Sequence, residues 1–148
     1  MMLRVLAAWL AAVVAATVAG SLIQSHFTLA AIGRIHEPVA WRDRLVVYGH
    51  DLMHFAPLWG VIVALGLLIA FVVAGWVGRH RPAWRWTLFP LAGLVAVLTA
   101  LLVMQAMLPV TLIAAARSGL GVVLLGLGGA LGGAVYLAVV SYRQKGQN

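Results

Sequence analysis

Apolar residues dominate four long stretches of the chain, and short polar segments separate these stretches. Each stretch is long enough to supply the roughly 20 helical residues that cross a hydrocarbon core. The pattern therefore predicts an all-α integral membrane protein with a single domain, a four-helix bundle of up-down-up-down topology. The predicted transmembrane helices cover about residues 4–32, 51–77, 86–108 and 119–141.

The segment between the first two predicted spans has helical features of its own. Gly33 is a good stop signal for the first helix, and Pro38 suits the first turn of a new one. Gly49 then predicts the end of this short helix. We therefore expect an extramembrane element over about residues 33–50 that contains a short interfacial helix. Pro57 predicts a kink near the start of the second span, because proline removes a backbone hydrogen bond.

The composition supports lipid rather than water as the main solvent. The chain of 148 residues is 64% hydrophobic and 9% charged, whereas soluble domains carry about 25% charged residues. A soluble fold of this size could not bury so much apolar surface. The sequence has no cysteine, which excludes disulfides and thiolate metal sites.

The formal net charge of +7 comes from basic residues in the short segments between the spans. This placement indicates anionic lipid headgroups as the partner, and not nucleic acid. Six cations and no acid flank one predicted side of the membrane, against four cations and three acids on the other. The positive-inside rule then places both termini and the turn over residues 79–85 in the cytoplasm of a bacterial inner membrane.

Small residues form rows along the first and fourth predicted helices. In lipid, helices associate where small residues allow close approach, so we expect these two helices to pack most closely. Two uses of the rows are consistent with the pattern: packing within one chain, or contact with a homo-oligomer or a larger membrane complex. The residues concerned are Ala8, Ala12, Ala16 and Gly20 in the first helix, and Gly128, Gly129, Gly132 and Gly133 in two overlapping GxxxG pairs of the fourth.

Polar residues gather at one depth, the non-cytoplasmic end of the predicted bundle. We expect Asp51 and Arg117 to pair there, because charges near a membrane are costly alone and less so together. One interpretation is a structural polar latch that fixes the helix ends, and the other is a small-molecule or ion site that opens outward. The residues of this predicted cluster are Gln24, His26, Asp51, His54, Gln105 and Arg117.

Three histidines in the same region raise the question of a cofactor. His50 and His54 are four residues apart and would share one face of a helix, as metal-binding histidines do. His26 lies at a similar depth, so the alternative prediction is a divalent metal or a b-type haem held between facing histidines. Because no complete ligand set has a diagnostic spacing, our first expectation is a chain without a cofactor.

The sequence also argues against several functions. No acidic or basic residue lies near the middle of a predicted span, unlike in most ion-coupled transporters. No nucleophile elbow or phosphate-binding loop is present, so we do not expect an enzyme. We interpret the chain as a non-enzymatic structural or accessory subunit that packs through its Ala- and Gly-rich helices. The alternatives are a haem- or metal-binding protein and a carrier or channel for a lipid or small solute.

Overall fold

The computed structural model describes residues 2–33, 40–80, 82–107 and 113–145, which form helices without any strand. Each of the four long helices has the length and the apolar composition needed to cross a membrane. The predicted four-helix membrane bundle is therefore confirmed. The long helices are α1 (Met2–Ile32), α2 (Trp41–His80), α3 (Arg85–Met107) and α4 (Gly119–Lys145), and two short 3-10 helices are η1 (Pro82–Trp84) and η2 (Ala114–Arg117).

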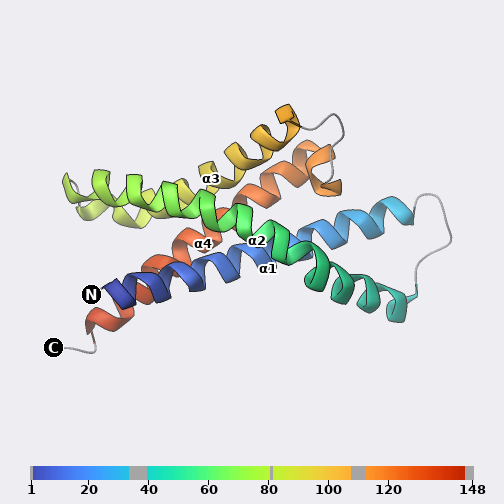
Figure 1. Ribbon diagram of the computed structural model, residues 1–148, viewed down its shortest axis with the longest axis horizontal. Coiled ribbons are helices and arrows are strands. Elements are labelled where there is room, and N and C mark those ends of the chain that lie inside the picture. Colours follow the sequence, from blue (N-terminus) through green and yellow to red (C-terminus); the bar gives the residue numbers. More distant parts are fainter. Residues whose placement is uncertain (1, 34–39, 81, 108–112, 146–148) are drawn as a thin grey trace.

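Successive helices run in opposite directions (Figure 1). The start of α1, the turn between α2 and α3 and the end of α4 lie on the left of this view. We call this the basic end, because Arg79 and Arg85 flank the turn. We call the other end, where α1 leads towards α2 and α3 towards η2, the opposite end. Helix α4 packs against both α1 and α3, while α2 packs against α1 and α3.

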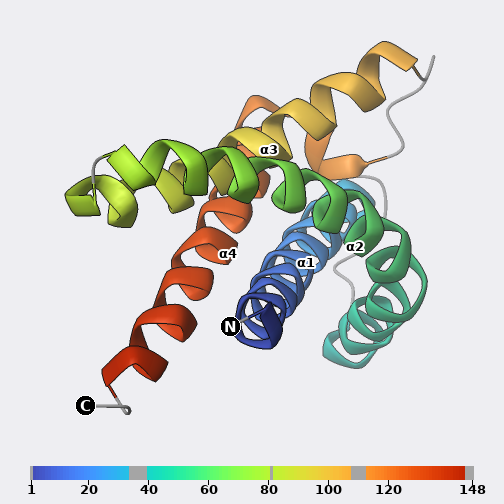
Figure 2. The ribbon, with the colours of Figure 1, turned by 60° about the vertical axis from the view of Figure 1, so that its left-hand side comes forward.

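Helix α2 is longer than the sequence predicted. It runs without a break from Trp41 to His80, so Gly49 does not end a separate interfacial helix. A glycine inside a helix costs only about 1 kcal/mol, and the apolar residues on both sides of Gly49 continue the helix. Residues 41–50 are thus the first turns of α2, and residues 34–39 lie outside the described part of the chain. Pro57 is inside α2, and Figure 2 shows the helix change direction between its teal and its green part.

Two glycine rows on α4 face two different helices. Gly132 faces α1, where an added Cβ atom would lie 2.9 Å from the carbonyl oxygen of Ala12 and 3.0 Å from the Cβ atom of Ala16. Gly129 faces α3, where an added Cβ atom would overlap the carbonyl oxygen of Gly93. Helix α4 thus approaches α3 as closely as it approaches α1, and the sequence analysis had named α1 alone.

The neighbouring glycines repeat this division. A Cβ atom on Gly128 would contact the Cβ atom of Ala19 on α1 at 3.5 Å, and one on Gly133 would overlap the backbone of Phe89 on α3. On α1, the whole predicted row is buried inside the chain, as Ala8, Ala12, Ala16 and Gly20. The small residues therefore bring the helices of one chain together.

Helices α1 and α2 meet through a large side chain placed on a small one. Trp59 of α2 is 2% exposed, and its indole nitrogen lies directly over Gly20 of α1, where an added Cβ atom would overlap it. Phe55 stacks on Trp59 with 5.9 Å between ring centroids. This contact holds α1 and α2 together in the half of the bundle that lies towards the opposite end.

Candidate functional site

The predicted polar residues lie at the opposite end, and the structure joins some of them to neighbouring helices. Gln24 is 7% exposed. Its side-chain oxygen Oε1 accepts a hydrogen bond from the backbone N–H of Ala115, with a nitrogen–oxygen distance of 3.0 Å. This bond ties η2 to α1 across 91 residues of sequence. Gln24 therefore satisfies a backbone donor that would otherwise be buried without a partner.

Asp51 makes a second connection between helices at this end. The hydroxyl of Ser25 on α1 donates to Oδ2 of Asp51 on α2 at 2.8 Å. Ser25 is buried, yet the sequence analysis had not included it in the cluster. Gln105 of α3 donates from Nε2 to the carbonyl oxygen of Ala116 at the longer distance of 3.4 Å. The pairing of Asp51 with Arg117 stays a prediction.

The histidines are exposed and do not form a three-ligand site. The rings of His50 and His54 stack with 4.1 Å between centroids, whereas His26 contacts the ring of Phe27 edge-on at 6.1 Å. Within the described part of the chain, no three His, Asp or Glu side chains are grouped so that they could hold a metal ion. Haem or metal binding by these histidines stays a prediction.

A cleft at the basic end was not predicted. Here the hairpin of α2 and α3 diverges from the start of α1 and the end of α4, as Figures 1 and 2 show. The cleft has a volume of about 1040 Å³. Its lining comes from all four long helices: Met2, Val5, Leu6 and Trp9 of α1, Leu68, Phe71, Val72, Gly75, Trp76, Gly78 and Arg79 of α2, Arg85 and Phe89 of α3, and Tyr136 of α4.

Three aromatic rings form one wall of this basic-end cleft. The ring of Phe71 lies 5.4 Å from that of Phe89 and 4.7 Å from that of Tyr136, and Phe89 stacks on Tyr136 at 4.9 Å. All three side chains are buried. They join α2, α3 and α4, so they form a firm boundary between the cleft and the core of the bundle.

Two arginines give the otherwise apolar basic-end cleft a positive charge. Arg79 is the next-to-last residue of α2 and Arg85 is the first residue of α3, so the two cations lie on either side of the short turn. The guanidinium of Arg85 lies 6.0 Å from the ring centroid of Phe89. Between these cations and the apolar wall, Gly75 leaves room, because a Cβ atom built on it meets no atom within 4 Å.

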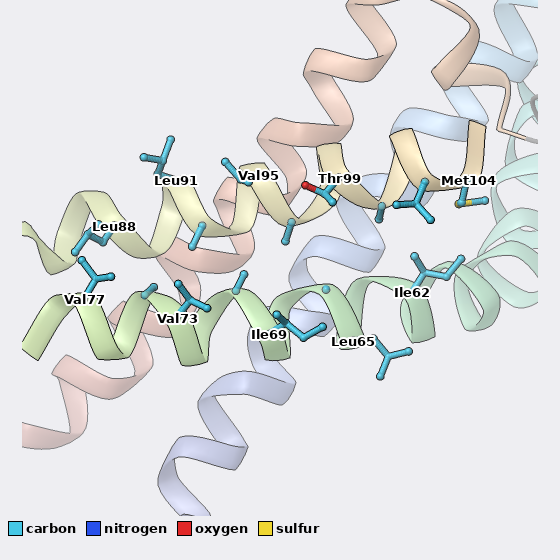
Figure 3. Close-up of a pocket in the computed structure, with 17 residues that line it drawn as sticks. Ile62, Leu65, Ile69, Val73, Val77, Leu88, Leu91, Val95, Thr99 and Met104 are labelled. Carbon is cyan, nitrogen blue, oxygen red and sulfur yellow. The ribbon is translucent and has the colours of Figure 1, made fainter. Parts of the chain in front are cut away.

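A second hollow lies between α2 and α3 and differs from the cleft in its chemistry. Figure 3 shows this α2–α3 groove, which has a volume of about 760 Å³. Apolar side chains such as Ile69 and Val95 line it, and Thr99 is the only residue with a hydroxyl among those that do. Lipid chains can fill such a groove without any polar recognition, so it carries little specificity.

The comparisons with known proteins leave the site to be interpreted from its own chemistry. No family model matches the chain, and no curated protein or solved structure is significantly similar to it. The sequence did contain one signal for the basic-end cleft: Gly75 and Gly78 precede the basic turn on the same helix. The sequence analysis had used the basic residues of that turn for orientation and for contact with anionic headgroups, and it had not predicted a cleft there.

Proposed function

We propose that this chain is a bacterial inner-membrane protein that binds an anionic amphiphile, such as an anionic phospholipid, in the basic-end cleft. The observation that carries the proposal is the combination of apolar walls with the guanidinium groups of Arg79 and Arg85 in one cleft. Ligand sites are typically concave and apolar, with a few polar groups that fix the orientation of the ligand. An amphiphile with one negative headgroup matches both features.

The charge distribution supports a cytoplasmic position for the basic end. Lys and Arg are enriched on the cytoplasmic side of membrane proteins, and the acids that the structure describes, Asp43 and Asp51, lie on α2 towards the other end. The cytoplasmic leaflet is also the source of anionic lipids, and each basic residue near its surface contributes about 1 kcal/mol of attraction. The cleft would then face the leaflet in which its ligand is enriched.

The proposal favours the earlier idea of a lipid carrier or binding protein over that of an accessory subunit. The accessory role had the Ala- and Gly-rich helices pack either with one another or with a larger complex, and Gly129 lies against Gly93 and Gly132 against Ala12 of the same chain. These small-residue rows are covered without any second subunit. Binding of an amphiphile needs only the cleft and its two cations.

Lipid binding by the purified protein in detergent, measured by native mass spectrometry, tests the role of charge. We expect tighter binding of phosphatidylglycerol than of zwitterionic phosphatidylcholine. Arg79→Gln and Arg85→Gln should each weaken binding of the anionic lipid about 5-fold, the equivalent of about 1 kcal/mol. Arg42→Gln, which removes an exposed cation from the opposite end, is the control and should bind like the wild type.

A second variant tests the apolar part of the cleft without changing any charge. Gly75→Leu should place a side chain in the cleft and exclude the lipid, since nothing lies within 4 Å of a Cβ atom at this position. Gly49→Leu makes the same change at a position of α2 that is equally open but outside the cleft, and should leave binding intact. Equal binding by all these variants, or no preference for the anionic lipid, would contradict the proposal.

A further inference from the structure

The two arginines of the basic-end cleft reach it from adjacent points of the α2–α3 turn. Gly78 is buried and lies directly before Arg79 on α2. The stem of Arg85 crosses α2 at this glycine, since a Cβ atom built on Gly78 would lie 3.2 Å from Cγ and 3.8 Å from Cδ of Arg85. The guanidinium of Arg85 continues towards Phe89, 6.0 Å from the ring centroid. Both cations therefore serve the same end of the cleft.

Among the residues that the structure describes, no acidic side chain lies near these two charges. The lining of the basic-end cleft contains neither Asp nor Glu. Asp43 and Asp51 belong to the first part of α2, towards the opposite end. At 1.5 Å per residue along a helix, Asp51 is about 40 Å from Arg79. A ligand that brings two negative charges would therefore balance the two arginines.

Tyr136 adds a neutral hydrogen-bond donor to the wall beside Arg85. Its side chain is 9% exposed, and its ring packs against those of Phe71 and Phe89. Arg85 acts electrostatically on the hydroxyl of Tyr136, but none of the hydrogen bonds among the described residues includes that hydroxyl. A buried tyrosine hydroxyl usually has a partner, and a ligand in the cleft would supply one.

Phosphate headgroups differ in the charge and in the oxygens that they offer to these donors. A phosphodiester carries one negative charge and two free oxygens. A phosphomonoester carries a charge of about −1.5 to −2 at pH 7 and three oxygens that accept hydrogen bonds strongly. Guanidinium groups bind such oxygens through charge-assisted hydrogen bonds. Two cations and one neutral hydroxyl thus match the monoester both in charge and in the number of oxygens.

We infer, on the basis of the proposed function, that the ligand of the basic-end cleft is a lipid phosphomonoester bound by Arg79, Arg85 and the hydroxyl of Tyr136. Tyr136 would donate to a phosphate oxygen that the arginines leave free, and so favour monoesters over diesters. The apolar wall would hold the acyl chains, so a soluble phosphomonoester would bind much more weakly.

Competition between two lipids with identical acyl chains tests the headgroup, with the full chain in detergent and native mass spectrometry as the readout. Phosphatidic acid is the monoester, and phosphatidylglycerol is the diester. At pH 8 we expect phosphatidic acid to bind about 5-fold tighter or more, because it brings a second negative charge to the two arginines. Glycerol 3-phosphate, which has the same phosphate without acyl chains, should not displace it at equal concentration.

A change of pH separates the charge of the phosphate from the size of the headgroup. The second proton of a phosphomonoester has a pKa of about 6, so at pH 5 phosphatidic acid carries mostly one charge and its advantage should nearly disappear. The arginines at this end, Arg4 of α1 among them, stay charged over this range. Histidines become charged over it, and the ring of His80 contacts that of Trp76 in the cleft. Because this charge acts on both lipids, the ratio of their affinities reports the phosphate.

Tyr136→Phe tests the hydroxyl, since it keeps the ring in contact with Phe71 and Phe89. It should weaken binding of phosphatidic acid about 5-fold and reduce its advantage over phosphatidylglycerol. Tyr142→Phe makes the same change at an exposed residue of α4 outside the cleft, and should bind like the wild type.

The possible results separate the choice of headgroup from the proposed function. Equal binding of phosphatidic acid and phosphatidylglycerol, both tighter than phosphatidylcholine, would overturn the inference and leave the proposed function standing. No advantage of either over phosphatidylcholine would overturn both. An advantage of phosphatidic acid that is unchanged at pH 5, or unchanged by Tyr136→Phe, would also overturn the inference. Displacement by glycerol 3-phosphate at equal concentration would do so too, because the acyl chains would then contribute nothing.

Discussion

The two ends of the bundle are built differently. At the opposite end, polar bonds join segments that are distant in the sequence: Gln24 binds the backbone of Ala115, and Ser25 binds Asp51. At the basic end, the α2–α3 hairpin diverges from α1 and α4, and the cleft lies between them. Both ends are made from the same four apolar helices, so the apolar character of the helices as a whole does not explain the difference.

The comparison shows what closes a helix bundle in lipid. Apolar side chains gain little by leaving lipid for one another, so close contact depends on small residues and on polar bonds between helices. Gly129 and Gly93 are the small residues that allow close contact between α4 and α3. At the opposite end, the hydrogen bonds of Gln24 and Asp51 join neighbouring segments. Between the start of α1 and the end of α2, by contrast, Gly75 lines the cleft, and a Cβ atom built on it meets no atom within 4 Å.

The largest expected effect comes from filling the tightest contact. Gly129→Leu should destabilise the bundle by about 3 kcal/mol or more, because its Cβ atom would overlap the carbonyl oxygen of Gly93 and push α3 from α4. The free energy of unfolding in detergent measures this change. Gly119→Leu, on the same helix but with nothing near its Cβ position, is the control. Equal stability of the two variants would show that the glycine contact does not hold α3 against α4.

The next effect should come from the buried polar bond at the opposite end. Gln24→Leu leaves the backbone N–H of Ala115 without its acceptor and should cost about 1–3 kcal/mol. Gln105→Leu loses only a long bond of an exposed side chain, and should cost less than about 0.5 kcal/mol. If both variants lost the same stability, the bond of Gln24 would not be what ties η2 to α1.

The partner of Asp51 can be identified with double-mutant cycles in the same unfolding assay. We expect Ser25→Ala and Asp51→Ala to show a coupling energy of about 1 kcal/mol, since the two side chains are hydrogen-bonded. A cycle with Asp51→Ala and Arg117→Ala measures the ion pair that the sequence predicted. Coupling in the second cycle alone would show that the carboxylate is held by the arginine and not by the serine.

The smallest effect on stability is expected inside the basic-end cleft. Gly75→Leu should keep the free energy of unfolding or raise it by up to about 1 kcal/mol, because leucine favours helices more than glycine does and meets no neighbour here. Gly129→Leu makes the same change in a tight contact, so the difference in stability between the two variants reports the space around Gly75. If Gly75→Leu lost as much stability as Gly129→Leu, α1 and α2 would be in close contact at Gly75, and the cleft would not be open there.

The sequence predicted the number of helices, but not the shape of the bundle. Long apolar stretches determine spans in lipid, and the residues of the row from Ala8 to Gly20 lie on the buried side of α1. The sequence analysis missed Gly93, because a single glycine in an apolar helix does not belong to a small-residue repeat that would mark it as a contact. The cleft was missed because lipid tolerates exposed apolar residues, so their pattern does not show where two helices separate.

The candidate polar site was predicted only in part, for a related reason. Its charged and amide residues stand out in an apolar sequence, and Gln24 and Asp51 were among them. Serines such as Ser25 are common in membrane helices, where their hydroxyls often bond to their own backbone. The place of Ser25 in the α1–α2 contact depends on the rotation of α1 about its axis, which only the packed structure shows.

The most direct test of amphiphile binding compares two adjacent positions of α2 by photo-crosslinking. A benzophenone side chain at Val72 would lie in the basic-end cleft, and one at Val73 would lie in the α2–α3 groove on the other side of the helix. In bilayers that mix phosphatidylglycerol with phosphatidylcholine, the captured lipid at each position is identified by mass spectrometry. We predict that Val72 captures more of the anionic lipid than its share of the bilayer, whereas Val73 captures the bilayer ratio. The same ratio at both positions would contradict a specific site at the basic end.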